Sequence, residues 1–280
     1  MQNPNLTGTF ELVTVASGAR SLRSLEYGEI FHPVVGPMAE ARELHVAQQR
    51  MAERARLNDS PPFVVWDVGL GAAANAIAAL EALSKVDARA DLHSFDGTLA
   101  PLEFALNHAR ELCYFEGWET PIAELLRGGR SGHAQIDWLF HPGNFRERLN
   151  DSSIPSPHAV MFDPYSPTAN PGLWNLETFA ALRSRAGDRN CTLTSYSRST
   201  AVRTTLLLAG WFVGRGGATG EKTETTVAAT HPELLTHPLE PEWLDRVRRS
   251  TAAGPLTHSR GETRTGLQVA TELAEHPQFQ

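Results

Sequence analysis

Phe63-Val64-Val65-Trp66-Asp67-Val68-Gly69-Leu70-Gly71 is the stretch that decides the fold. Its first half is almost continuously apolar, as strands buried on both faces of a parallel sheet are. Gly69 and Gly71 permit a tight turn and allow a ligand to approach the backbone closely. The alanine-rich segment 72–83 predicts a helix whose first amide groups are free to bind that ligand. The stretch therefore predicts a strand, a ligand-binding turn and a helix.

The same alternation of strand and helix patterns continues along the chain. We expect a doubly wound α/β fold, because strands that alternate with helices form parallel sheets with right-handed crossovers. The predicted sheet is Rossmann-like and has seven mostly parallel strands, an antiparallel last strand and helices on both faces. Apolar runs predict the strands at 63–67, 92–95, 136–140, 158–162, 191–196, 211–213 and 225–229, and helical spacing predicts helices at 99–113, 174–185 and 202–209.

Three parts follow from this pattern. Residues 1–60 predict a small β hairpin, which turns at Ser17-Gly18, and one helix over 37–57. Residues 61–232 form the predicted core. Residues 233–280 are interpreted as a C-terminal extension with one short helix over 242–249.

Composition excludes several classes of protein. The net charge of −7 does not indicate a nucleic-acid binder by bulk electrostatics. Cys113 and Cys191 are isolated and match no metal or redox spacing, which indicates reduced thiols in a cytoplasmic protein. The eleven histidines form no ligand cluster, so we expect no metal. No apolar run has membrane-spanning length, residues 1–5 lack the pattern of a signal peptide, and no pattern fixes an oligomeric state.

Polar residues follow the first three predicted strands of the core, where open α/β sheets bind their ligands. Asp67 suits a cationic or amino-bearing ligand better than a pyrophosphate. Asp96 follows the second strand at a spacing from the glycines that commonly places a carboxylate on ribose hydroxyls. Asn144 follows the third strand and is able to hydrogen-bond an adenine edge. Asp96 and Asn144 also suit helix N-caps, and both interpretations stay open.

The block Phe162-Asp163-Pro164-Tyr165-Ser166-Pro167, with Trp174 beyond it, carries the chemistry. A carboxylate accepts a hydrogen bond from an amine, Pro164 stiffens the loop, and the aromatic rings supply flat apolar walls. Burial beside those groups favours a neutral amine, whereas the carboxylate favours an ammonium. The combination suits the capture of an amino group for methyl transfer, which is an in-line displacement that depends on such positioning. The alternative is a strand end with a plain Asp-Pro turn.

The order and spacing of these motifs resemble one family of class I methyltransferases. This family comprises the bacterial tRNA methyltransferases that complete methylaminomethyl-thiouridine at the wobble position, namely the MnmC methyltransferase domain and its stand-alone MnmD relatives. The match runs from about residue 27 to 230. Besides the segments above, it includes 27–29 with His32, 194–197, 202–203, 209–213 and 220–224.

The resemblance implies S-adenosylmethionine as methyl donor and an aminomethyl group of tRNA as acceptor. It assigns the residues to roles as follows: catalysis to Asp163 and Tyr165, cofactor binding to Asp67, Gly69, Gly71, Asp96 and Asn144, and substrate binding to Pro164, Trp174, Tyr27 and His32.

Two other functions remain open from the sequence. One is a methyltransferase of a small-molecule amine, which fits the acidic composition. The other is a non-catalytic relative that binds cofactor or RNA, because Ala73 and Asn144 depart from the family's usual Gly and Asp. Arginines within 127–130, 146–148, 198–203 and 246–249 either contact tRNA phosphates or are solvated surface residues.

Overall fold

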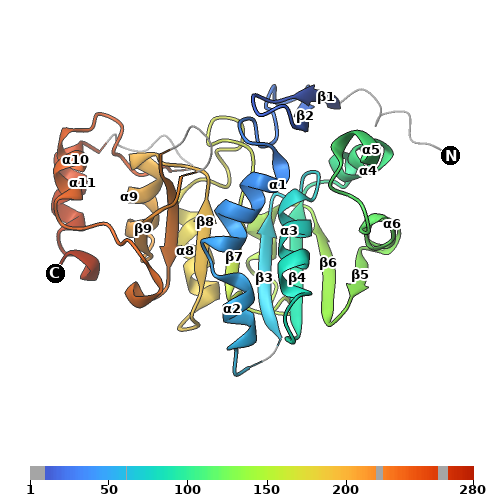
Figure 1. The fold of residues 1–280 in the computed structure, drawn as a ribbon. Helices are drawn as coiled ribbons and strands as arrows, with labels where there is room; N and C mark the ends of the chain where they lie inside the picture. The colour runs from blue at the N-terminus through green and yellow to red at the C-terminus, as the bar shows by residue number, and fades with distance from the viewer. Residues whose placement is uncertain (1–9, 61, 219–222, 258–263) are drawn as a thin grey trace.

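A central sheet of eight strands organises the molecule (Figure 1). The computed structural model describes residues 10–60, 62–218, 223–257 and 264–280. The strand order is β5-β6-β4-β3-β7-β8-β10-β9. The strands are β3 (Phe63–Val68), β4 (Ala90–Asp96), β5 (Arg130–His133), β6 (Ile136–Pro142), β7 (Ala159–Phe162), β8 (Thr192–Ser195), β9 (Phe212–Gly216) and β10 (Thr225–Ala229).

The predicted sheet is confirmed, with one strand more than expected. Strands β6, β4, β3, β7 and β8 are parallel, and β10 runs antiparallel to both β8 and β9. The additional strand, β5, pairs antiparallel with β6 at the edge of the sheet. Its sequence, Arg130-Ser131-Gly132-His133, has no apolar alternation, and backbone pairing with β6 alone makes it a strand.

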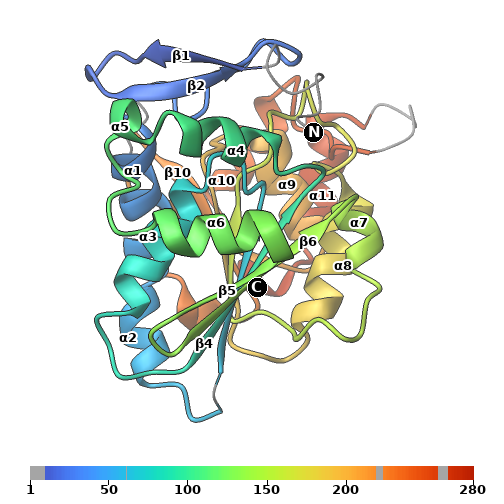
Figure 2. The ribbon, with the colours of Figure 1, turned by 90° about the vertical axis from the view of Figure 1, so that its right-hand side faces the viewer.

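Helices cover both faces of the sheet, as predicted. Figure 2 shows α2 and α3 on one side and α7 and α8 on the other. All six residues of β3 are buried, and alternate side chains enter the two cores. Apart from those near the N-terminus, the α-helices are α3 (Ala74–Leu83), α4 (Ala100–Asn107), α5 (Ala109–Leu112), α6 (Glu119–Gly128), α7 (Phe145–Arg148), α8 (Leu176–Ala186), α9 (Thr200–Leu208), α10 (Trp243–Arg249) and α11 (Gly266–Leu273).

The N-terminal segment contains the predicted hairpin, β1 (Phe10–Thr14) and β2 (Arg20–Ser24), above the carboxyl edge of the sheet (Figure 1). The prediction of one continuous helix over 37–57 is wrong, because the segment contains three helical elements. These are α1 (Pro37–Glu40), the π-helix η1 (Ala41–Ala47) and α2 (Met51–Arg56). Arg50 has a φ of 49° and interrupts the helix before α2, whereas the residue spacing in the sequence is compatible with a continuous helix.

Other helix boundaries also differ from the predictions. The helix expected over 99–113 is interrupted at His108, which separates α4 from α5. Helices α6 and α11 were not predicted. Side chains of α10 and α11, such as Trp243 and Val269, pack in the same core as β3 and α8. The short 3-10 helices η2 (Pro232–Leu234) and η3 (Pro277–Phe279) complete the fold, and residues 220–222 of the family motif lie outside the described residues.

Candidate active site

A cavity of about 1020 Å³ opens at the carboxyl ends of β3, β4 and β7. Parallel strands end there together, which is where open α/β sheets bind ligands. Three segments form most of its wall: the glycine turn 68–72, the loop that begins at Asp163, and residues 26–33 of the N-terminal part. Its size suits two reactants side by side.

The glycine turn packs directly against the backbone of the Asp163 loop. Gly69 has a φ of 94°, and a Cβ atom placed there would lie 2.7 Å from the carbonyl oxygen of Asp163. The amide of Asp163 donates to the carbonyl of Val68. Glycine is therefore required at 69 for both conformation and space. Ala73 has a φ of 63°, so alanine adopts the left-handed conformation at the position where the related family has glycine.

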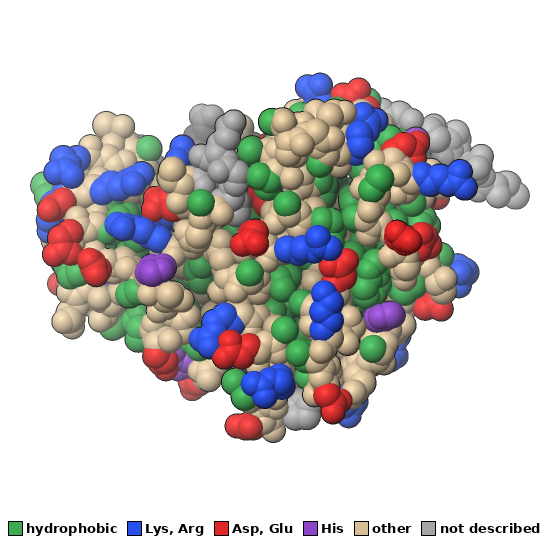
Figure 3. All heavy atoms as spheres, viewed as in Figure 1, with side chains coloured by type: hydrophobic (Ala, Val, Ile, Leu, Met, Phe, Trp, Pro, Cys, Tyr) green, Lys and Arg blue, Asp and Glu red, His purple; other side chains and the backbone are tan. Residues whose placement is uncertain are grey.

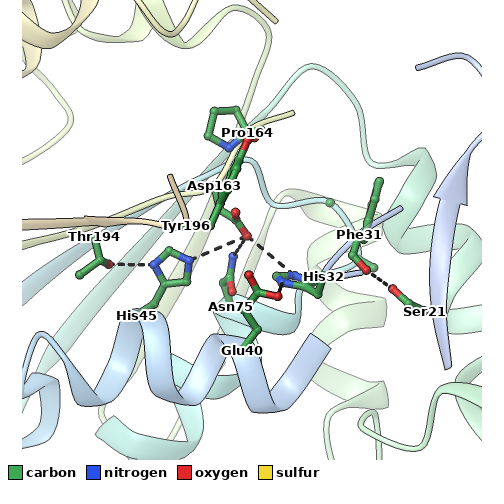
Figure 4. Close-up of polar contacts among 12 residues, drawn as sticks. Ser21, Phe31, His32, Glu40, His45, Asn75, Asp163, Pro164, Thr194 and Tyr196 are labelled. Carbon is green, nitrogen blue, oxygen red and sulfur yellow. Dashed lines mark hydrogen bonds and ion pairs between the residues drawn. The ribbon is translucent and has the colours of Figure 1, made fainter. Parts of the chain in front are cut away.

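Three side chains converge on one oxygen of Asp163 (Figure 4). Asn75 Nδ2 donates to Oδ2 at 2.8 Å, and the Nε2 atoms of His32 and His45 each lie 3.8 Å from that same oxygen. Among the described residues, no hydrogen bond to Oδ1 accompanies these interactions of Oδ2. The carboxylate is thus anchored through Oδ2, while Oδ1 is available to a ligand in the cavity.

The surroundings of Asp163 keep it ionised. Burial by itself raises the pKa of a carboxyl, but here the contact with His45, the charge of His32 and the amide of Asn75 outweigh burial and lower the pKa of Asp163. A carboxylate that stays charged in a partly closed cavity is an acceptor for N–H groups and attracts cations.

His45 and Asn75 reach Asp163 from different helices and were not singled out from the sequence. His45 lies on η1 with no exposed surface, and its Nδ1 is 2.8 Å from Thr194 Oγ1 (Figure 4). Asn75 lies in the first turn of α3. Asn75 lies in the segment 72–83, directly after the glycine turn, so its position in the sequence was a signal. His45 carries no local signal, because the helical pattern over 37–57 does not reveal a π-helix.

Residues of the N-terminal segment form a roof over the Asp163 loop. Both carboxylate oxygens of Glu29 accept hydrogen bonds from Ser166, Oε2 from its amide at 3.0 Å and Oε1 from its hydroxyl. The rings of Tyr27 and Tyr165 stack with centroids 4.3 Å apart, and Tyr27 is exposed on the surface. Burial raises the pKa of Tyr165 far above its ordinary value, so it stays neutral. This segment joins the hairpin to the site.

Four of the five predicted cofactor residues line the cavity, namely Gly69, Gly71, Asp96 and Asn144. Asp96 Oδ2 accepts the Gly71 amide at 3.0 Å, and Asp96 lines the cavity. A fixed carboxylate beside a glycine turn fits a ribose with two hydroxyl donors. Asn144 caps α7 through a hydrogen bond from the Arg146 amide, and it also lines the cavity.

Two predicted site residues lie outside the cavity. Asp67 is completely buried below the turn and accepts a hydrogen bond from Ser94 at 2.8 Å. Trp174 is also buried, and its Nε1 donates to the carbonyl of Tyr165 at 2.7 Å. Trp174 therefore supports the loop from behind. Pro164, Tyr165, Tyr27 and His32 all line the cavity.

The cavity is acidic, and positive charge is scarce around it. Its lining includes one arginine, Arg146, and five carboxylates, Glu26, Glu29, Glu40, Asp96 and Asp163. Several arginines proposed from the sequence as phosphate contacts are engaged elsewhere: Arg203 is buried against Glu224, and Arg130 and Arg248 pair with Asp137 and Asp245. Figure 3 shows both signs of charge interspersed over the face in view.

None of the described helices has the length and apolar character needed to cross a membrane. In the described part of the chain, no group of three or more His, Cys, Asp or Glu side chains is arranged to hold a metal ion. Both cysteines are free, Cys113 on the surface and Cys191 in the core.

Comparison of the sequence with known proteins points to one kind of enzyme. Residues 129–231 match the family model of S-adenosyl-L-methionine-dependent methyltransferases of the Methyltransf_30 type. The tRNA 5-methylaminomethyl-2-thiouridine biosynthesis bifunctional protein MnmC of Aeromonas hydrophila is 28% identical over 221 residues, which cover 72% of this chain and 32% of that protein. The MnmC protein of Ralstonia nicotianae is 26% identical over 276 residues, 90% of this chain and 38% of that protein. The chain thus spans about a third of the length of these relatives.

Comparison of structures agrees with the sequence. The crystal structure of MnmC2 from Aquifex aeolicus superposes with a TM-score of 0.72 at 25% identity. The superposition covers 97% of this chain and 85% of that one. The likeness therefore extends beyond the sheet to the N-terminal segment and to α10 and α11.

Proposed function

Since the chain is an MnmC-like S-adenosyl-L-methionine-dependent methyltransferase, we propose that it methylates the aminomethyl nitrogen of 5-aminomethyl-2-thiouridine at the wobble position of tRNA. We further propose a cytoplasmic location, where tRNA is modified. The relatives supply the direction of this proposal, because their names specify biosynthesis of that nucleoside. The site supplies the chemistry.

The observation that carries the proposal is the free oxygen of Asp163. Oδ2 is held by Asn75 and faces His32 and His45, whereas Oδ1 has no hydrogen-bond partner among the described residues. An alkylamine offers N–H donors that fit this oxygen. The acidic lining attracts a primary amine, which is mostly protonated at neutral pH.

The cofactor supplies an electrophilic methyl group on a sulfonium, and the chain's own residues prepare the amine. Asp163 Oδ1 orients the amine and accepts the proton that it must lose. Pro164 and Tyr165 exclude water and favour the neutral form. Asp96 and the glycine turn would hold the ribose of the cofactor. Holding the amine and the cofactor in a fixed mutual position then favours the displacement.

Asp163→Asn tests this role. The variant keeps the shape of the side chain and can keep a contact to Asn75, but it loses the charge and most of the proton-accepting power. We expect methyl transfer to fall by about a hundredfold or more, with little change in cofactor affinity. Asp188→Asn, at an exposed position far along the chain, is the matched control. If the Asn variant melts much lower and keeps its activity per folded molecule, Asp163 is structural and the proposal is wrong.

A small-molecule amine is the second candidate acceptor. It is favoured by the acidic cavity and by the engagement of several arginines in ion pairs. Labelled cofactor should be supplied with tRNA from a strain that lacks the final wobble methylation, and separately with small alkylamines. Transfer to the tRNA with a steep decrease at higher salt supports the proposal. Transfer to the amines alone supports the second candidate.

A further inference from the structure

A continuous series of hydrogen bonds leads from Arg54 to the site, through residues to which neither the sequence nor the comparisons give a role. Arg54 Nη1 donates to Thr192 Oγ1, and Thr192 Oγ1 donates to Gln49 Oε1 at 2.7 Å. Gln49 Nε2 lies 2.9 Å from Thr194 Oγ1, which lies 2.8 Å from His45 Nδ1. His45 Nε2 then faces Asp163 Oδ2 (Figure 4).

Arg54, at the start of the series, and the carbonyl of Val160, beside Gln49, fix the direction of each hydrogen bond. A guanidinium only donates, so the Thr192 hydroxyl accepts from Arg54 and directs its own hydrogen to Gln49 Oε1. The Gln49 amide cannot be reversed, because its Nε2 also donates to the carbonyl of Val160 at 3.2 Å. Gln49 Nε2 therefore donates to Thr194 Oγ1.

The last step fixes the protonation of His45. Thr194 Oγ1 accepts a hydrogen bond from Gln49, so its own hydroxyl hydrogen remains to be donated. Among the described residues, the acceptor paired with this hydroxyl is His45 Nδ1. An imidazole that accepts at Nδ1 carries its hydrogen at Nε2 when neutral. His45 Nε2 is buried without any other partner, 3.8 Å from Asp163 Oδ2.

We propose that this series sets His45 as the neutral Nε2–H tautomer, and that Thr194, Gln49 and His45 are positioning residues that hold Asp163 Oδ2 so that Oδ1 faces the acceptor amine. The inference rests on the proposed function, because it assigns a purpose to the orientation of Asp163. His45 faces the carboxylate at 3.8 Å, and Thr194 and Gln49 act through His45.

The series positions Asp163 and does not conduct protons away from it. Its far end is Arg54, whose guanidinium is held by the carbonyls of His158 and Asn190 and cannot accept a proton. A proton taken by Asp163 must leave through Oδ1 and the cavity. A rigid arrangement of donors is what a site needs when catalysis depends on geometry.

The π-helix η1 provides the backbone for this arrangement. The amide of Gln48 donates to the carbonyl of Glu43, five residues back, as in a π-helix. Single π-turns occur often at functional sites. The wider turn lies beside β8, and His45 within it and Gln49, two residues beyond its end, both reach Thr194 on that strand.

Thr194→Val and Thr194→Ser form the decisive pair of variants. Valine matches threonine in shape but has no hydroxyl, whereas serine keeps the hydroxyl. We expect Thr194→Val to lower kcat for methyl transfer about tenfold, with KM for the cofactor unchanged, because one interaction that orients Asp163 is lost. Thr194→Ser should restore kcat to within about threefold of the unsubstituted protein. Equal kcat in the two variants, or a loss confined to KM, overturns the proposal.

Nitrogen NMR of histidine-labelled protein gives a readout that needs no methyl acceptor. The His45 signals are assigned as those absent from His45→Gln. We expect an unprotonated Nδ1 and a protonated Nε2 in the unsubstituted protein and in Thr194→Ser, and loss of this single tautomer in Thr194→Val. A protonated Nδ1 in the unsubstituted protein overturns the proposal. If the protein methylates neither tRNA nor amines, the proposed function fails, while this measurement still decides the state of His45.

Discussion

Asp67→Asn should remove a pH-dependent loss of stability that originates below the active site. Asp67 is completely buried, and burial raises its pKa from 3.8 to about 7, with smaller contributions from the carboxylates of Asp163 and Asp96. The hydrogen bond from Ser94 lowers the pKa but does not compensate, and Oδ1 has no partner in the described structure. Charging Asp67 therefore costs free energy in the folded state.

The sign and size follow from proton linkage. Between about pH 4 and pH 7 the folded protein keeps a proton on Asp67 that the unfolded chain has released, so the free energy of unfolding falls as pH rises. A pKa raised from 3.8 to about 7 corresponds to a total of about 4 kcal/mol. Above about pH 7 that loss is complete. The asparagine variant has no such group, although a buried amide N–H without a partner costs about 1–3 kcal/mol at every pH.

Urea unfolding of both proteins at pH 5, 7 and 8.5 measures the effect. The difference between the two proteins is the quantity to follow, because the buried His93 and His158, whose pKa values burial lowers to about 4, make stability rise with pH in the same range. Asp163, with its lowered pKa, acts only in more acidic solution. We expect Asp67→Asn to gain about 2–4 kcal/mol relative to the unsubstituted protein between pH 5 and 8.5. A constant difference over that range would refute the reasoning.

Three further substitutions test the walls of the cavity. Gly69→Ala should destabilise the protein by about 2–4 kcal/mol in chemical unfolding, since its Cβ would meet backbone atoms at 2.7 Å at a positive φ, whereas Gly128→Ala, with open space around it, should be tolerated. Glu29→Gln removes one of two acceptors that hold the facing loop and should lower kcat/KM about tenfold, while Glu11→Gln, exposed on β1 and outside the cavity lining, should not. Asp96→Ala should weaken S-adenosylmethionine binding by about 1–3 kcal/mol in calorimetric titration, and unchanged affinity would remove Asp96 from the cofactor site.

The sequence predicted the central sheet well because its signals are local. Buried strands such as 63–68 are continuous apolar runs, and the glycine turn follows directly after one of them. Strand β5 was missed because a short polar edge strand is defined by its neighbour and not by its own residues. The same holds for η1, where the widening of the helix depends on packing against α3 and β8.

The candidate site was predicted at its strand ends and missed where distant segments meet. Asp163 and Asp96 follow strands of the sheet, so their position at its carboxyl edge could be inferred. The contacts of Asp163 with His45 and Asn75 join residues about a hundred apart, and no local pattern reports such distances. Trp174 shows the opposite error: an aromatic beside the motif was assigned to the substrate, although it supports the loop from the core.

Asp67 and Asp163 show how one fold holds two carboxylates in different states. Asp67 lies near the end of β3 and Asp163 follows the neighbouring strand β7, and the charge of Asp163 raises the pKa of Asp67. The conflict is resolved by unequal surroundings, because Asp163 receives Asn75 and two imidazoles, whereas Asp67 has one hydroxyl donor. When environments push two pKa values apart in this way, one group stays ionised for chemistry and the other becomes ionised only near pH 7. It follows that Asp163→Asn, by removing a neighbouring charge that is present near pH 7, should lower the pKa of Asp67.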